Sequence, residues 1–154
     1  MGFIIVETWI DAPPDRCFEL ARDVGAHVES AGFSGERAVP PGRTAGLLEL
    51  GDRVTFEGVH FGIRQRITAE ITELDRPRRF VDQLVRSAFE RLRHEHDFHA
   101  RDGGTLMVDT LEWVAPFGIL GRLADRLFLE RHMRWFVSTK QQALKGIAER
   151  RSSP

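Results

Sequence analysis

The chain has 154 residues, enough to bury a core, and the simplest expectation is one domain over residues 1–154. Its 22 basic and 23 acidic residues give a net charge of −1, so the charge does not favour nucleic acid or an anionic membrane as a partner. The single cysteine, Cys17, excludes an internal disulfide and favours a reducing, cytoplasmic location. The N-terminal segment lacks the features of a signal peptide, and no apolar run has the length of a membrane span.

The N-terminal third is expected to hold one strand and two short helices. Residues 3–10 are rich in Ile, Val, Thr and Trp, which is typical of a strand. The segment Asp11-Ala12-Pro13-Pro14-Asp15 ends this strand and opens a helix, because proline suits a first turn and aspartate suits the N-terminal dipole. Residues 23–30 are expected to form a second short helix. Residues 31–52 are rich in glycine, and we expect a loop with one short strand near 35–39.

The central part has the two-residue period of antiparallel strands. Residues 63–72 alternate between a largely apolar set and a charged or hydroxylated set, as a strand with one buried face does. Phe61-Gly62 and Asp102-Gly103-Gly104 have the composition of hairpin turns, and Asp75-Arg76-Pro77 that of a turn. Strands are therefore expected at 53–60, 63–72, 79–88, 90–100 and 105–114.

The C-terminal part has a helical period. The segment Ala115-Pro116-Phe117-Gly118 breaks the sheet, and apolar residues then recur at helical spacing from Ile119 to about Arg150. This pattern predicts one long helix. An antiparallel sheet with a long helix segregated to its face is an α+β architecture.

Three segments carry a resemblance to a known family: TWIDAPPDRCFELARD, GDRVTFEGVHFGIRQRITAEITELDRPRRFVDQLVRSAFERLRHEHDF and PFGILGRLADRLFLERHM. With them the chain resembles the SRPBCC superfamily (START-like, helix-grip), near the bacterial ligand-binding members of the polyketide cyclase/dehydrase branch. The resemblance implies a curved antiparallel sheet of about seven strands that grips the C-terminal helix, with a cavity between them. It implies no catalytic residues, because this scaffold hosts carriers, cyclases, receptors and chaperone activators.

Three of the six histidines lie in residues 91–99, RLRHEHDFH. On a strand, His94 and His96 share one face with Leu92 and Phe98, whereas His99 lies on the opposite, charged face. We expect the first face to be concave and to look toward the long helix. The same alternation predicts further inward residues on neighbouring strands: Val54, Phe56, Gly58 and His60; Phe80, Asp82 and Leu84; and Met107, Asp109, Leu111 and Trp113.

Five of these inward residues are polar: His60, Asp82, His94, His96 and Asp109. Buried polar groups need partners, and three interpretations remain open. The groups form a structural His–Asp network, or they orient a mostly apolar ligand. In the third interpretation a His–Asp pair is the general base for enolisation or aldol closure of a polyketide-like substrate.

A metal site is the weaker alternative. The H-x-H spacing of His94 and His96 could supply two zinc ligands, with His60 or Asp109 as a third. The spacing alone has low specificity, and we expect no metal and no cofactor. Cys17 lies on the apolar face of the first helix, where an inert core thiol is expected.

The leading hypothesis is a protein that binds a lipid-like, polyketide-like or aromatic molecule in a cavity between the concave sheet and the C-terminal helix. A cyclase or dehydratase is the first alternative, and a non-enzymatic interaction module the second; a homodimer is left open. The expected apolar contacts are Phe56, Trp113, Phe117 and Leu120. The expected polar contacts are His60, Asp82, His94, His96 and Asp109, and no catalytic residue is assigned.

Overall fold

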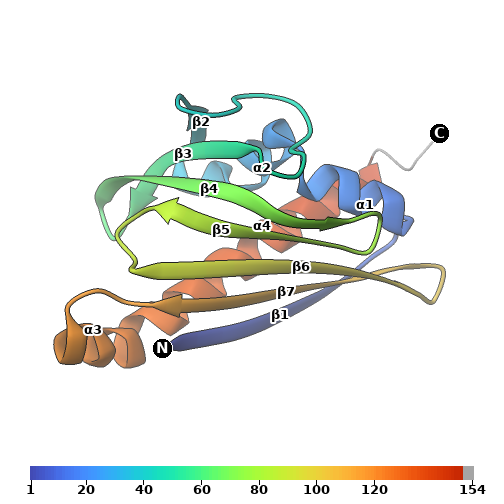
Figure 1. The fold of residues 1–154 in the computed structure, drawn as a ribbon. Coiled ribbons are helices and arrows are strands. Elements are labelled where there is room, and N and C mark those ends of the chain that lie inside the picture. The colour runs from blue at the N-terminus through green and yellow to red at the C-terminus, as the bar shows by residue number, and fades with distance from the viewer. Residues whose placement is uncertain (151–154) are drawn as a thin grey trace.

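Seven antiparallel strands form one sheet in the order β1-β7-β6-β5-β4-β3-β2 (Figure 1). The structure is a computed structural model that describes residues 1–150. Its strands are β1 (Gly2–Ile10), β2 (Arg37–Val39), β3 (Arg53–His60), β4 (Ile63–Asp75), β5 (Arg79–Arg86), β6 (Arg91–Arg101) and β7 (Gly104–Val114). Its helical elements are α1 (Pro14–Ala21), α2 (Val24–Ser30), η1 (Gly32–Ser34), α3 (Gly118–Ala124), η2 (Asp125–Leu129) and α4 (Glu130–Arg150). The predicted α+β architecture is confirmed.

Two tight hairpins fix the register of the sheet. Phe61 and Gly62, with φ values of 52° and 72°, join β3 to β4. Asp102 and Gly103, with φ values of 51° and 77°, join β6 to β7. Two consecutive residues with positive φ form the turn whose twist matches that of paired strands. Both turns lie where the sequence predicted them.

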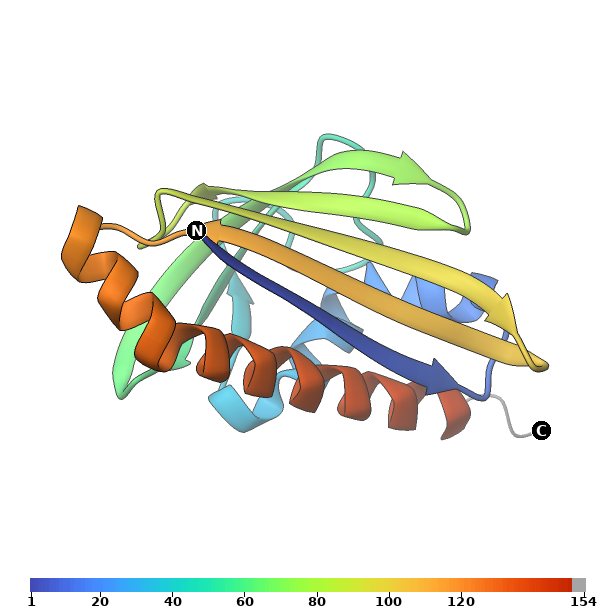
Figure 2. The same cartoon turned by 90° about the horizontal axis from the view of Figure 1, so that it is seen from below.

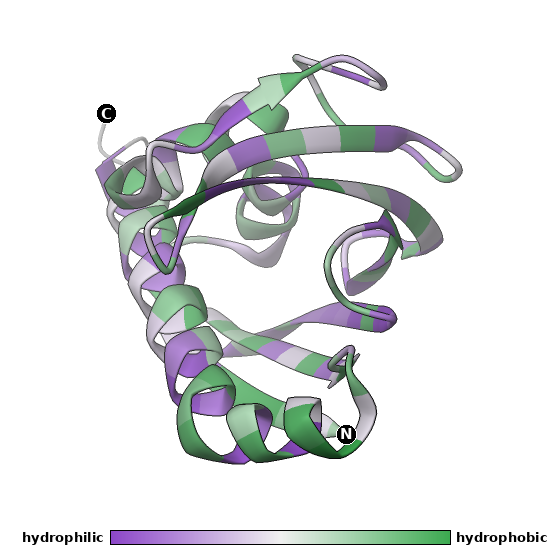
Figure 3. Ribbon diagram, turned by 90° about the vertical axis from the view of Figure 1, so that its left-hand side faces the viewer, coloured by the Kyte–Doolittle hydropathy of each residue, from purple (hydrophilic) through white to green (hydrophobic). Residues whose placement is uncertain are grey.

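The sheet is curved, and α4 lies along its concave side. The pairing of β4 with β5 shifts at Thr68/Ala69 and again at Ile71/Glu73, and such irregularities bend and twist a strand. Figure 2 shows α4 running along the sheet beside β1. Seen end-on, the strands form an arc around the space that α4 borders (Figure 3). None of the helices in residues 1–150 combines the length and apolar character needed to cross a bilayer.

The predicted faces of the central strands are confirmed. His96 is buried and His94 partly buried, whereas His99 is exposed. On β7, Met107, Asp109, Leu111 and Trp113 are buried at alternate positions. The alternation was predictable because a strand without an internal bulge keeps its period of two.

Two apolar clusters make up the core. The larger lies under α1 and α2, where the Phe18 ring packs edge-on against Phe80 and Phe98 at centroid distances of 5.7 and 5.6 Å. The smaller lies at the other end of the sheet and includes Leu111 and Trp113 of β7. Polar side chains lie in the interior between these two clusters.

The C-terminal helix is continuous from Gly118 to Arg150, but residues 125–129 form a π-helical turn. This turn carries Asp125 into the interior, where its Oδ1 accepts a 2.7 Å hydrogen bond from Trp113 Nε1. Gly121 allows α3 to start tightly, because a Cβ there would lie 1.7 Å from the carbonyl oxygen of Pro116. The hydrogen bond and the close approach together tie the helix to the end of β7.

We expect Asp125→Ala to lower the free energy of unfolding by about 1–3 kcal/mol, because it leaves the buried Trp113 N–H without its acceptor. Urea unfolding followed by tryptophan fluorescence measures this. Glu130→Ala is the matched control: Glu130 is an acidic residue of the same helix with about half of its side chain exposed, and its loss should change stability by less than about 0.5 kcal/mol. Equal effects of the two substitutions would contradict the role given to Asp125.

Candidate functional site

A cavity of about 170 Å³ lies between the concave sheet and α4. Its apolar wall comes from the sheet, the β5–β6 connection and α4, and includes Phe56, Ile67, Leu84, Phe89, Leu92, Met133 and Phe136. Its polar lining comprises His27, Glu36, His60, Gln65, Asp82, His94, His96, Asp109, His132 and Lys140. Residues of both core clusters border the cavity, so it fills the gap between them.

Six of the residues predicted from the sequence line this cavity: Phe56, His60, Asp82, His94, His96 and Asp109. They come from β3, β5, β6 and β7, all from the face that the two-residue period assigned to the interior. His60 lies at the end of β3, where its Nδ1 is 3.4 Å from His132 Nε2 of α4.

The structure does not place Trp113, Phe117 and Leu120 among the residues that line the cavity, so their observed positions differ from the expected ones. Trp113 is only 1% exposed, but it packs in the smaller core cluster and bonds to Asp125. Phe117 and Leu120 are 82% and 75% exposed. The backbone turns at Phe117, which has a φ of 70°, so α3 projects past the end of the sheet (Figure 1).

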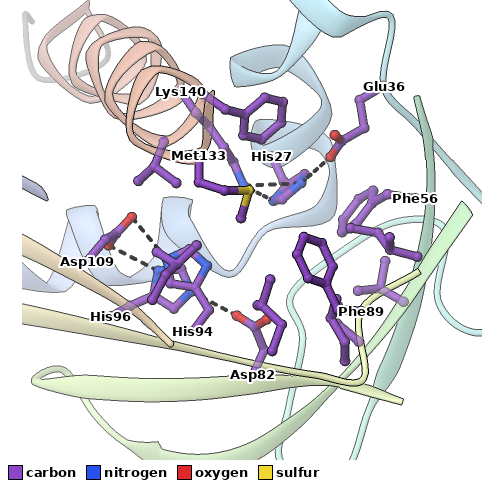
Figure 4. Close-up of a pocket in the computed structure, with 18 of the residues that line it drawn as sticks. His27, Glu36, Phe56, Asp82, Phe89, His94, His96, Asp109, Met133 and Lys140 are labelled. Atoms are coloured by element: carbon purple, nitrogen blue, oxygen red, sulfur yellow. Dashed lines mark hydrogen bonds and ion pairs between the residues drawn. The ribbon is translucent and has the colours of Figure 1, made fainter. Parts of the chain in front are cut away.

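Four of the polar residues form a compact His–Asp cluster on three neighbouring strands. The register pairs Asp82 of β5 with His94 of β6, and His96 of β6 with Asp109 of β7. His96 Nε2 is 2.9 Å from Asp82 Oδ2 in hydrogen-bond geometry, and its Nδ1 is 3.3 Å from Asp109 Oδ1. The two imidazole rings lie close together, with centroids 3.7 Å apart (Figure 4).

Both imidazoles of the His–Asp cluster contact carboxylates, but only His96 does so in hydrogen-bond geometry, through its Nε2. His94 Nε2 is 3.3 Å from Asp109 Oδ2, an ion-pair distance, but it has no partner in hydrogen-bond geometry within residues 1–150. Asp109 Oδ1 also lacks such a partner in this part of the chain. Buried polar atoms usually have a hydrogen bond, and here the ion-pair contacts at 3.3 Å take its place.

The cluster gives the two histidines opposite charge states. Burial alone would lower the pKa of His96, but the carboxylates of Asp109 and Asp82 outweigh it and raise the pKa to about 9. Burial lowers the pKa of His94, and the nearby charge of His96 lowers it further. Burial works against ionisation of Asp109, yet His96 and His94 hold its pKa below the usual range. At neutral pH the site therefore presents an imidazolium beside a neutral imidazole.

A second polar group, from the helical side of the cavity, was not predicted. Lys140 Nζ of α4 lies 2.6 Å from His27 Nδ1 of α2, and His27 Nε2 lies 2.5 Å from Glu36 Oε1 (Figure 4). The His27 ring stacks on Phe56 at a centroid distance of 3.9 Å. Burial, reinforced by the charge of Lys140, lowers the pKa of His27 to about 4, and burial also lowers the pKa of Lys140.

The sequence did contain a signal for Lys140. It lies three residues after Val137 and four before Leu144, which puts it on the apolar stripe of the predicted helix. It is also one of only two lysines in a chain that otherwise uses arginine. His27 and Glu36 carried no comparable signal, because one lies in a short helix and the other in a glycine-rich segment.

The His–Asp cluster has the composition of a metal site. Asp82, His94 and His96 each offer one ligand atom, and these atoms lie within 4.8 Å of one another. Two imidazoles and one carboxylate are ligands that zinc and other transition metals accept. A metal would have to compete with the proton of His96, whose pKa is raised to about 9. The expectation that no metal is needed stays a prediction.

We expect His96 to remain an imidazolium up to about pH 9, and nitrogen chemical shifts of the ring measure this directly. Because the folded-state pKa lies above the ordinary value of about 6.5, the stabilisation is complete below pH 6.5 and is lost as pH rises through about 9. The free energy of unfolding of wild type relative to His96→Gln should therefore fall over this range.

The comparison with His96→Gln isolates this group from Lys140, whose lowered pKa gives stability the opposite dependence on pH. Asp82→Asn is the control: it removes one carboxylate from His96 and should lower the midpoint of the ring titration. A His96 ring that loses its proton at or below pH 6.5 in wild type would contradict the assignment.

No protein-family model matches the sequence, and a search of curated proteins gives no match. Solved structures do match over nearly the whole chain. A protein from Thermus thermophilus is 23% identical, with a TM-score of 0.80, and the match covers 99% of this chain and 100% of that one. The Zhui aromatase/cyclase from a Streptomyces species is 19% identical, with a TM-score of 0.79, and the match covers 98% and 95%.

A plant protein shares the same arrangement of elements. The ginseng major latex-like protein 151 from Panax ginseng is 13% identical, with a TM-score of 0.71, and the match covers 96% of this chain and 97% of that one. At such low identities the likeness concerns the fold, which these proteins share from β1 to α4 despite their different sequences. The chain has the helix-grip α+β fold that its sequence implied, and these solved structures share it.

Proposed function

We propose that the chain binds a small, mostly apolar molecule in the cavity between the concave sheet and α4. The observation that carries this proposal is the cavity itself, which combines apolar walls with a few converging polar groups. Small-molecule sites generally have this composition, since the apolar area supplies affinity and the polar groups fix orientation. The resemblance to ligand-binding SRPBCC proteins supports the same proposal.

The size of the cavity favours a ligand built on one or two rings. A volume of about 170 Å³ is similar to that of an engineered cavity of about 150 Å³ that takes up benzene. The polar side chains in the lining favour a ligand with at least one hydrogen-bonding group. An aromatic or short polyketide-like molecule meets both conditions.

We expect such a molecule to raise the thermal midpoint of the wild-type protein. A ligand that binds only the folded state adds about 2.7 kcal/mol at a hundred times its dissociation constant. The screen uses aromatic polyketides, isoprenoids, sterols and fatty acids. Met133→Trp should abolish the shift, because the Met133 side chain lies in the cavity (Figure 4) and a larger side chain would fill it.

Leu120→Trp is the matched control, because Leu120 is 75% exposed and lies outside the cavity. It should respond to ligand as wild type does. The proposal fails if no compound shifts the midpoint of wild type, or if a compound shifts Met133→Trp as much as Leu120→Trp.

A second candidate function is acid–base catalysis of an aldol closure or dehydration. Its specific support is the pair of touching imidazoles, of which His94 is neutral and His96 protonated, so that a base and an acid lie side by side. One structural neighbour is an aromatase/cyclase, which fits this chemistry.

If a bound compound is converted, we expect His94→Ala to lower the rate of conversion by about 10²–10⁴-fold while leaving the thermal shift in place. Product formation is followed by chromatography of the same mixtures used for binding. His99→Ala is the control, because His99 lies on the opposite face of the same strand. Equal rates for His94→Ala and wild type would remove His94 from the reaction.

A further inference from the structure

The two lysines of this chain lie on one helix in opposite environments. Lys140 lines the cavity, and its Nζ has His27 as its hydrogen-bond partner. Within residues 1–150 no carboxylate lies in ion-pair contact with Lys140 Nζ, although Glu36, Asp82 and Asp109 act on it through space. Lys145, by contrast, pairs with Glu149 and donates to the carbonyl of Trp9.

The surroundings of Lys140 favour its unprotonated form. Burial outweighs the distant carboxylates and lowers the pKa of its ammonium group. An amine without its proton carries a free electron pair and is a nucleophile for carbonyl carbon. Lys140 is thus a buried nucleophile that neither proposed function has used so far.

His27 and Glu36 are arranged to handle the proton of this amine. His27 stacks on Phe56, which fixes the plane of its ring, and its Nε2 lies 2.5 Å from Glu36 Oε1. A carboxylate at Nε2 holds the ring proton there and leaves Nδ1 as the acceptor, while Lys140 Nζ lies beside the ring, 2.6 Å from Nδ1 and 3.2 Å from Nε2. A nucleophile, an acceptor for its proton and a carboxylate that orients the acceptor are thus in successive contact.

We propose that Lys140 attaches a carbonyl-bearing ligand covalently, by forming an imine with an aldehyde or ketone held in the cavity. Lys140 reacts as the free amine: its nitrogen electron pair adds to the carbonyl carbon, and the π electrons of the carbonyl move to the oxygen. One N–H proton passes to that oxygen by way of His27 Nδ1, which gives a carbinolamine. The hydroxyl group then leaves as water with the second N–H proton and the C=N bond forms, so the step needs no oxidant or reductant.

This inference rests on the proposed binding function and narrows the class of ligand to aldehydes and ketones. The apolar walls select a hydrophobic body, and Lys140 selects an aldehyde or ketone on it. A cavity of about 170 Å³ suits an aromatic aldehyde of one or two rings. We therefore take 2-naphthaldehyde as the probe and 2-naphthalenemethanol as its partner, which has the same ring system but cannot condense with an amine.

The test traps the imine by reduction. The full-length protein is incubated with 2-naphthaldehyde and sodium cyanoborohydride at pH 7, and peptides are mapped by mass spectrometry. We expect the reduced adduct on Lys140 to exceed that on Lys145 by at least about tenfold, because Lys140 lines the cavity that holds the aldehyde, whereas Lys145 is paired with Glu149 outside it. This comparison is made within one wild-type molecule, so it does not depend on the folding of a variant.

Variants then distinguish covalent attachment at Lys140 from non-covalent binding in the cavity. Lys140→Met should lose the adduct, whereas Lys145→Met, outside the cavity, should keep both the adduct and the thermal shift caused by 2-naphthalenemethanol. His27→Gln should slow labelling of Lys140 at least about tenfold, because it removes the proton acceptor.

Equal labelling of Lys140 and Lys145, together with a thermal shift from 2-naphthalenemethanol, would overturn the covalent site and leave the binding function standing. Selective labelling of Lys140, with no thermal shift from 2-naphthalenemethanol, would support the covalent site. The same result would count against the proposed non-covalent binding of ligands. Equal labelling with no shift would overturn both proposals.

Discussion

Four ionisable groups buried at adjacent positions on three strands constrain the whole site. Asp82, His94, His96 and Asp109 face the same cavity, and an isolated buried charge would be expensive in such surroundings. Two carboxylates need compensation, and both reach the ring of His96: Asp109 is its register partner, and Asp82 contacts it diagonally. His94 can then remain neutral, because a second imidazolium beside the first would be repelled. The difference between the two rings follows from their contacts, because His96 contacts two carboxylates and His94 contacts one.

This part of the site could be predicted from the sequence because it depends on local geometry. Alternation along β6 separates His94 and His96 from His99, and the same period on β5 and β7 brings Asp82 and Asp109 to the same face. The two hairpin turns could also be predicted from the sequence, because few residue types tolerate positive φ at both turn positions. The fold followed from the order of these elements and from the resemblance to a known superfamily.

The remaining part could not be predicted, because it depends on how separate elements pack. Lys140, His27 and Glu36 come from α4, α2 and the segment before β2, and no sequence period relates those three segments. The helical stripe around Leu120 has the same spacing whether or not the sheet extends beneath it, so its 75% exposure was not foreseeable. Asp125 reaches Trp113 from a π-helical turn, which shifts the helical phase locally.

Two neighbouring residues of α4, Lys140 and Gln141, have different roles. Gln141 bonds the helix to the sheet, whereas Lys140 lines the cavity. Gln141 is 2% exposed and is fully engaged with β1: Thr8 Oγ1 donates to its Oε1 at 2.6 Å, and its Nε2 donates to the Val6 carbonyl at 3.2 Å. These bonds hold the helix against the edge strand. The hydrogen bonds of Lys140 run instead to His27, across the end of the cavity. Because Gln141 already supplies the polar contact that docks this turn, the side chain of Lys140 is free of that role and lines the cavity instead.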